Sequence, residues 1–151
     1  MILLKMGGTS EVEFYSAETE SLMTLPFVSG GIAAGFPSPA DDYLDTGMDL
    51  NHELVKNPAT TFYGRVKGLS MKDDGILPND ILIVDKSLEP KNGDLAVCFI
   101  DGEFTLKRIA KKRDCIYLMP ANPEFKPMRV TEENDFIVWG IVTWVIKNTR
   151  R

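Results

Sequence analysis

The sequence has little histidine and little cysteine, which removes the common metal-binding patterns. One histidine and two cysteines occur in 151 residues. His52 has no cysteine or acidic neighbour at the spacing of metal ligands, and Cys98 and Cys115 are too far apart for a Cys-x-x-Cys site. We therefore expect no bound metal and no cofactor.

The sequence also lacks a long apolar run. Its longest apolar stretch, residues 136–146, is too short to span a bilayer and includes two tryptophans, a threonine and a glycine. The first residues lack the apolar core of a signal peptide. We expect no membrane association and a cytoplasmic location, where both cysteines stay reduced and buried as small apolar side chains.

An excess of positive charge is absent as well. The chain has 22 acidic and 17 basic side chains, a net charge of -5 and a pI near 4.9. Direct sequence-specific binding to nucleic acid is therefore not expected, and protein partners are favoured. A hydrophobic content of 44% and a charged content of 26% are typical of a globular domain, and the length suits one such domain.

What the sequence does contain divides it into two parts. Residues 1–39 lack sustained periodicity, which predicts a mobile N-terminal arm, with Gly30-Gly31 as its hinge. Residues 40–151 are predicted to form a β-rich domain. Near its start, Asp49 is expected to cap a short helix that carries Leu50 and Leu54 on one face and ends before Asn57-Pro58.

Strand patterns dominate the second part and predict a mostly β fold. They cover residues 60–67, 80–85, 94–100, 103–110, 115–119 and 137–146. Asp101-Gly102 predicts a two-residue hairpin turn. The last run predicts a long core strand bent near Gly140, with an exposed aromatic edge for dimerisation as the alternative.

Alternation along residues 103–110 gives the faces of that strand. Phe104 and Leu106 are expected on one face, and Thr105, Lys107 and Ile109 on the other. Lys107 is thus flanked by side chains that can exclude water.

Ser70 and Lys107 are the candidate catalytic residues. Ser70 follows a glycine where a strand ends, a position at which its own amide can help to stabilise an oxyanion. A serine nucleophile needs a base, and with one histidine in the chain a desolvated lysine is the sensible substitute. Separately, a serine at such a turn and a lysine on a strand are each ordinary structural residues.

A lysine can act as a base only when burial favours its neutral form. With the ordinary pKa of about 10.4, roughly one lysine in a thousand is neutral near pH 7.4, and desolvation can lower a lysine pKa by about 3 to 5 units. A substrate bond on the same chain would also raise its effective concentration. Self-cleavage therefore suits this pair of residues better than repeated turnover does.

Four segments carry a resemblance to a known family. They are Ala-Gly-Phe-Pro-Ser-Pro-Ala (34–40), Gly-Leu-Ser-Met (68–71), Asp-Ile-Leu-Ile-Val-Asp (80–85) and Asp-Gly-Glu-Phe-Thr-Leu-Lys (101–107). From about Leu25 to Lys147 the chain resembles the LexA/UmuD family of self-cleaving Ser-Lys proteases, and within it the UmuD branch. The resemblance implies a compact C-terminal β domain, with Ser70 as nucleophile and Lys107 as general base.

The resemblance also implies a substrate, a process and partners. The scissile bond would be Ala34-Gly35, leaving a product of residues 35–151. A RecA filament on single-stranded DNA would stimulate cleavage in the SOS response. The protein would form a homodimer, and the product would join the UmuC polymerase subunit in error-prone translesion DNA polymerase V.

The chain departs from the UmuD pattern at two places. Leu69 stands where UmuD proteins often have aspartate, and the stretch before Leu22 is longer than expected. Neither place involves Ser70 or Lys107.

Three other readings of the sequence are possible. A LexA-like repressor would need a DNA-binding domain, and a signal peptidase would need a membrane segment, and neither is evident here. A non-catalytic dimeric interaction module remains the strongest of the three. An ordinary solvated Lys107 and a chain that never cleaves would favour it.

Overall fold

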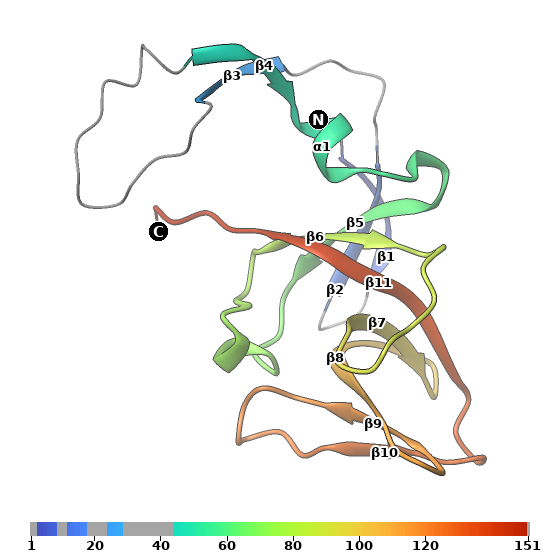
Figure 1. Cartoon of the computed structure of the whole chain (residues 1–151). Helices are drawn as coiled ribbons and strands as arrows, with labels where there is room; N and C mark the ends of the chain where they lie inside the picture. Colours follow the sequence, from blue (N-terminus) through green and yellow to red (C-terminus); the bar gives the residue numbers. More distant parts are fainter. Residues whose placement is uncertain (1–2, 9–11, 18–23, 29–43, 151) are drawn as a thin grey trace.

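The computed structural model describes residues 3–8, 12–17, 24–28 and 44–150. Ala34, Gly35 and Gly30-Gly31 lie outside the described residues, as does most of the predicted arm. Within the described part, nine strands form one antiparallel sheet and two more pair separately (Figure 1). The predicted fold class, mostly β, is confirmed.

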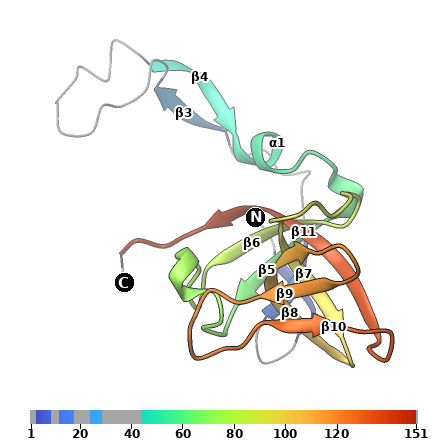
Figure 2. The same cartoon turned by 60° about the horizontal axis from the view of Figure 1, so that its bottom comes forward.

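The nine-stranded sheet has the order β1-β2-β5-β6-β11-β7-β8-β9-β10. Its strands are β1 (Leu3–Gly8), β2 (Val12–Ala17), β5 (Thr61–Val66), β6 (Ile81–Asp85), β7 (Leu95–Ile100), β8 (Glu103–Lys111), β9 (Ile116–Met119), β10 (Met128–Val130) and β11 (Phe136–Ile146). The separate pair is β3 (Thr24–Val28) with β4 (Leu44–Asp49). Figure 2 shows β7 to β10 side by side at one end of the body.

All six predicted strands of the domain are present. The hairpin between β7 and β8 turns at Asp101 and Gly102, whose φ angles of 49° and 88° are the positive values that the sequence predicts. β11 is one long strand, and its register with β7 shifts between Val138 and Gly140, where the sequence predicts a bend. Trp139 is partly buried and packs against the core, whereas Trp144 is exposed on the same strand.

Strands β1 and β2 lie within the stretch that the sequence assigns to the arm. β2 pairs with β5 and β1 pairs with β2, so both extend the main sheet. The alternation in residues 12–17 covers only six residues and includes Glu13 and Ser16, which is why the sequence gives so weak a strand signal. The division of the chain after residue 39 stays a prediction.

The described interior contains three apolar clusters, of which two are large and the third consists of Val55, Tyr63 and Ile83. One large cluster contains Val12, Phe14, Met71, Leu82 and Leu106, and the second contains Ala96, Cys98, Ile109, Leu118 and Ile141. Strand β8 contributes to both, because alternate side chains point to opposite faces.

The buried carboxylate of Asp85 connects the turn after α1 to the end of β6 through hydrogen bonds. The predicted helix is present as α1 (Leu50–Leu54), with Asp49 as its N-cap, followed by the 3-10 turn η2 (Pro58–Thr60). Asp85 at the end of β6 accepts hydrogen bonds from Asn57 Nδ2 at 2.7 Å, Thr60 Oγ1 at 2.8 Å and the amide and hydroxyl of Ser87. Burial raises the pKa of Asp85, but these hydrogen bonds together lower it below its ordinary value.

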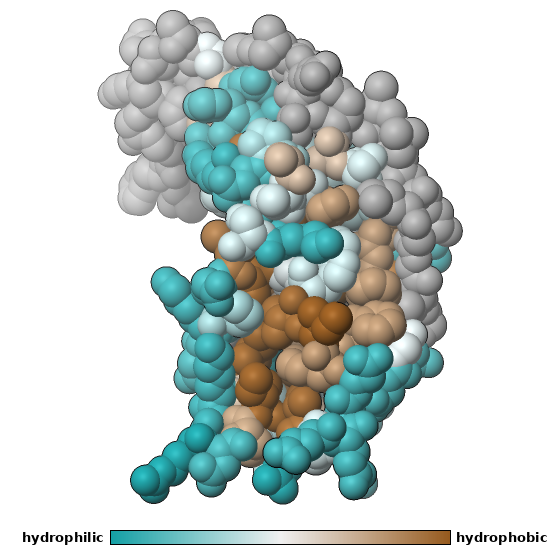
Figure 3. Space-filling model, turned by 90° about the vertical axis from the view of Figure 1, so that its right-hand side faces the viewer, coloured by the Kyte–Doolittle hydropathy of each residue, from teal (hydrophilic) through white to brown (hydrophobic). Residues whose placement is uncertain are grey.

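Part of the surface is apolar. Figure 3 shows apolar residues gathered in the middle of one face and hydrophilic residues along its lower borders. The exposed large apolar side chains among the described residues are Leu69, Leu88, Phe125, Met128, Ile137 and Trp144. No helix in the described part of the chain is long and apolar enough to cross a membrane.

Candidate active site

Lys107 lies in the middle of β8 with its side chain buried. Lys107 is 6% exposed. On β7, Ala96 lies directly opposite Lys107 and Cys98 lies directly opposite Thr105, and both are fully buried. Residues directly opposite each other in an antiparallel pair share a face, so the lysine stem lies over an apolar floor. The face assignments predicted for residues 104 to 109 are correct.

Ser70 lies in a tight turn after β5. Met71, the next residue, is 2% exposed and packs into the core, and the 3-10 turn η3 (Lys72–Asp74) follows. The turn closes through a hydrogen bond from the amide of Lys72 to the carbonyl of Leu69 at 3.2 Å, and Gly75 ends it with a φ of 77°. This anchoring holds Ser70 at a fixed place, although it is not part of a strand.

The structure brings Ser70 and Lys107 together. Lys107 Nζ donates to Ser70 Oγ at 3.1 Å and to Thr105 Oγ1 at 2.6 Å. Ser70 is 2% exposed, and its hydroxyl donates to the carbonyl of Leu106 at 3.5 Å. A hydroxyl and an amine at this separation can exchange a proton directly once the amine is neutral.

Residues between β9 and β10 hold the Ser70 turn in place through hydrogen bonds. The amide of Ala121 donates to the carbonyl of Ser70 at 2.7 Å, and the amide of Asp73 donates back to the carbonyl of Ala121 at 2.8 Å. Asn122, 5% exposed, donates through Nδ2 to the carbonyl of Leu69 at 2.9 Å. That carbonyl and the amide of Ser70 belong to one peptide plane, so Asn122 helps to fix the direction of the Ser70 N–H.

An ion pair joins the same turn to β8. Arg108, the neighbour of Lys107, contacts Asp74 of η3 at 3.0 Å and donates to the carbonyl of Gly93 at 3.0 Å. Both charged groups are substantially exposed, so the pair stabilises the protein little and serves mainly to restrict geometry.

Cys98 lies on the floor of the site and is fully buried. Burial raises its pKa to about 12, although the charge of Lys107 acts in the opposite direction. The second cysteine differs from the prediction: Cys115 is only half-buried and precedes β9 instead of lying within it.

Several residues that support the site carry no signal in the sequence. Ser70 and Lys107 were singled out from the sequence, but Asn122, Ala121 and the Arg108–Asp74 pair were not. Asn122-Pro123 has the form of an ordinary turn, and no local pattern links it to Leu69, 53 positions away.

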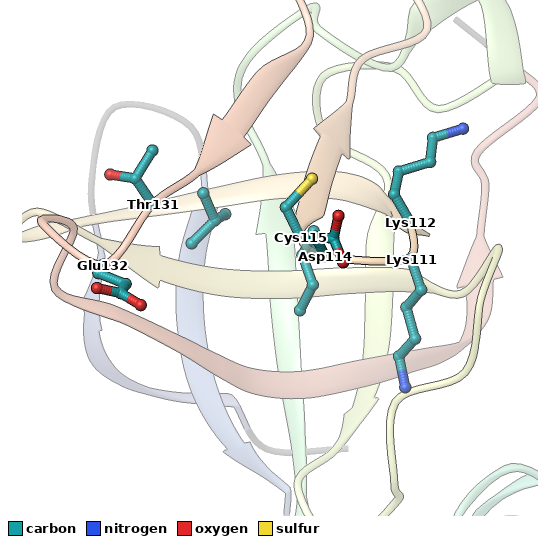
Figure 4. A pocket seen from close by; sticks show the side chains of 8 residues that line it. Lys111, Lys112, Asp114, Cys115, Thr131 and Glu132 are labelled. Atoms are coloured by element: carbon teal, nitrogen blue, oxygen red, sulfur yellow. The ribbon is translucent and has the colours of Figure 1, made fainter.

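A separate cavity of about 430 Å³ lies at the far end of β8 (Figure 4). Its lining includes Lys111, Lys112, Cys115, Val130 and Thr131, and neither Ser70 nor Lys107 contributes to it. The cavity therefore plays no part in the candidate active site.

Comparison with known proteins identifies the family. The Peptidase S24-like family model matches residues 26–143, which include Ser70 and Lys107. The chain belongs to this family. The match confirms the resemblance to the LexA/UmuD proteins that the sequence shows. It also supports a serine peptidase as the general kind of activity.

Individual proteins match most of the chain. Protein SamA of Salmonella typhimurium is 42% identical over 127 residues, which are 84% of this chain and 88% of the relative. Protein ImpA of Escherichia coli is 39% identical over 126 residues, 83% of this chain and 85% of the relative. Protein MucA of Escherichia coli is 38% identical over 132 residues, 86% and 89% of the two chains.

Proposed function

We propose that this chain is a serine peptidase that cleaves itself between Ala34 and Gly35, with Ser70 as nucleophile and Lys107 as general base. The observation that carries the proposal is the 3.1 Å separation of Lys107 Nζ and Ser70 Oγ inside a buried site. Membership of a peptidase family supports it independently.

The chemistry follows from the two side chains. Neutral Lys107 accepts the hydroxyl proton while Ser70 Oγ attacks the carbonyl carbon of Ala34, and the backbone amide of Ser70 is the candidate donor to the resulting oxyanion. The bond to Gly35 then breaks, and its nitrogen leaves with the proton returned by Lys107. Water hydrolyses the ester on Ser70 and releases residues 1–34 from residues 35–151.

We place this reaction in SOS mutagenesis. The likeness to UmuD proteins supports a role in which a RecA filament on single-stranded DNA promotes cleavage, and residues 35–151 act with UmuC in error-prone translesion DNA polymerase V. The filament would act by raising the population of the conformer in which Ala34 reaches Ser70, without supplying catalytic groups.

A homodimer is part of the proposal. The exposed apolar side chains described above, among them Trp144 and Ile137, give the domain a surface suited to a protein partner. A cytoplasmic location and the absence of direct sequence-specific nucleic-acid binding complete the expected setting.

The test compares purified wild type with Ser70→Ala and Lys107→Met at about pH 7 and about pH 10, with and without RecA filaments. Methionine keeps an apolar stem in place of the lysine but has no amine. We expect cleavage after Ala34 in the wild type alone, and faster at the higher pH because the neutral amine is then more abundant. Fragment masses give the cleaved bond.

Three outcomes would contradict parts of the proposal. A wild-type chain that stays intact under every condition would favour the non-catalytic interaction module. A rate that is the same at both pH values would argue against Lys107 as base. Gly35→Glu should block cleavage sterically without unfolding the domain, and unchanged cleavage of that variant would reject the assigned bond.

A further inference from the structure

We propose that the fragment upstream of the cleaved bond stays bound after cleavage, held as a docked strand on a strand-accepting edge formed by β5. The inference rests on the proposed cut between Ala34 and Gly35. Both β1 and β2 precede that bond, whereas β5 and the rest of the main sheet follow it. Cleavage would therefore convert a covalently attached strand into a bound peptide.

The main-chain pairing across the cut is extensive. β2 pairs with β5 in unbroken register from Val12 opposite Val66 to Ser16 opposite Phe62. The two-stranded sheet of β3 and β4 also joins the two cleavage products, because β3 precedes the bond and β4 follows it. Thr24 lies opposite Asp49 and Val28 lies opposite Leu44. Release of residues 1–34 would break both ladders and leave β5 as an open sheet edge.

Side chains of β2 are part of the domain core. Val12 is fully buried and Phe14 is 4% exposed, in the same apolar cluster as Met71 and Leu106. Those two residues are the immediate neighbours of Ser70 and Lys107. The fragment thus supports the packing beneath the active site and is not an appendage to it.

Phe14 packs against two aromatic rings of the domain. Its ring centroid lies 4.8 Å from that of Phe104 and 4.7 Å from that of Trp139, in tilted arrangements. At Gly64, opposite Phe14, an added Cβ would lie 3.1 Å from a methyl group of Val12, so β2 approaches β5 closely. The edge is shaped for this strand.

Polar contacts are made by the partly buried residues on the other side of the same strand. Glu13 forms an ion pair with Lys67 at 2.5 Å and accepts a hydrogen bond from Tyr15 at 3.0 Å. Lys67 follows the cut, so this pair also bridges the two products. Backbone pairing, buried anchors and one ion pair together are the elements of strand-addition recognition.

This arrangement gives cleavage a specific consequence. Before the cut, β2 is held at the β5 edge by the connecting chain, which raises its local concentration. After the cut, the strand can be replaced by a second strand of similar pattern. We infer that the occupant immediately after cleavage is residues 12–17 of this chain, and that the edge becomes exchangeable only then.

The experiment produces the nick in two ways. Wild type is allowed to cleave itself, and a Ser70→Ala chain that carries the recognition sequence of a sequence-specific protease within residues 30–38 is cut by that protease. Native mass spectrometry and size exclusion at micromolar concentration then report whether the two pieces stay together. We expect both nicked proteins to keep the N-terminal fragment.

A peptide competition identifies the edge without altering the protein. A labelled synthetic peptide of residues 10–19 should exchange into the nicked protein and not into the uncut chain. The same peptide with Phe14→Ser should bind at least tenfold more weakly, because it loses the ring contacts with Phe104 and Trp139. Binding of both peptides with equal affinity would overturn the assignment of the edge.

The two proposals fail differently. Loss of the fragment from both nicked proteins at micromolar concentration overturns the strand-docking inference and leaves self-cleavage intact. A wild type that never cleaves, with the fragment retained in the protease-cut chain, overturns the proposed self-cleavage and supports the docking.

Discussion

The side-chain nitrogen of Lys107 lies 3.1 Å from the hydroxyl oxygen of Ser70, although 37 positions separate the two residues. One residue comes from the middle of β8 and the other from the turn after β5, two strands that are not neighbours in the sheet. Their meeting depends on the packing of Met71 and Leu106 into one core cluster, which places the adjacent residues within reach of each other.

The hydroxyl of Thr105 is expected to orient Lys107. It accepts a hydrogen bond from Nζ at 2.6 Å on the same side as Ser70. Thr105→Val keeps the shape and removes the acceptor, and a lost hydrogen bond of about 1 kcal/mol corresponds to roughly fivefold slower self-cleavage. Thr105→Ser, which keeps the hydroxyl, should cleave at nearly the wild-type rate. A valine variant as fast as the serine variant would show that the contact is unimportant.

Asn122 is expected to act as a positioning residue for the Ser70 turn. Asn122→Asp keeps the acceptor for the amide of Glu124 but replaces the donor to the Leu69 carbonyl with an oxygen. We expect self-cleavage about tenfold slower at every pH, because the direction of the Ser70 amide is altered while Lys107 is not. Rates are measured across pH together with melting temperatures.

Asn134→Asp is the matched control for that variant. Asn134 Nδ2 donates to Asp101 at 2.7 Å, next to the β7–β8 hairpin turn and outside the Ser70 turn, so this substitution also removes one amide donor. It should leave the cleavage rate unchanged. If both variants slow cleavage only in proportion to their loss of stability, the role assigned to Asn122 is wrong.

Asp85 is expected to make stability depend on acid pH. Its pKa is lowered in the folded protein by hydrogen bonds that outweigh the effect of burial. A carboxylate whose pKa is lowered by folding stabilises the folded state at pH values above its unfolded-state pKa of about 3.9. This contribution is lost as the pH falls through the folded-state pKa. Asp85→Asn should therefore be less stable than wild type near neutral pH, and the difference should shrink below about pH 4.

Urea unfolding at several pH values measures this difference. Asp114→Asn, at an exposed carboxylate, is the control and should change stability little at any pH. A difference between wild type and Asp85→Asn that stays constant down to the acid limit would show that the Asp85 network does not titrate as expected.

The two cysteines are expected to react differently with a thiol reagent. Cys98 is fully buried and its pKa is raised to about 12, so the thiolate is scarce near pH 8. Cys115 is half-buried and lines the cavity at the end of β8. Iodoacetamide should modify Cys115 in the native protein and both cysteines after unfolding, as read by peptide mass spectrometry. Equal modification in the native state would contradict the burial of Cys98.

Local sequence patterns determine most of the strands of this protein and the turn of its β7–β8 hairpin. Alternation and turn residues predicted the six strands from 60 to 146, because a half-buried strand must alternate and because Asp101-Gly102 favours positive φ at both turn positions. Ser70 at a strand end and Lys107 on a strand face were candidates from the sequence because one histidine leaves few alternatives for a base, and the family resemblance implied the same two roles.

Tertiary structure decided what depends on partners distant in the sequence. Residues 12–17 become a strand because β5 offers an edge and because Phe14 packs against Phe104 and Trp139, and residues 3–8 pair in turn with residues 12–17. Asn122 and Ala121 hold the Ser70 turn through hydrogen bonds that span about fifty positions and leave no periodic signal. Local sequence encodes backbone preference and burial, whereas these contacts exist only once the sheet has brought separate segments together.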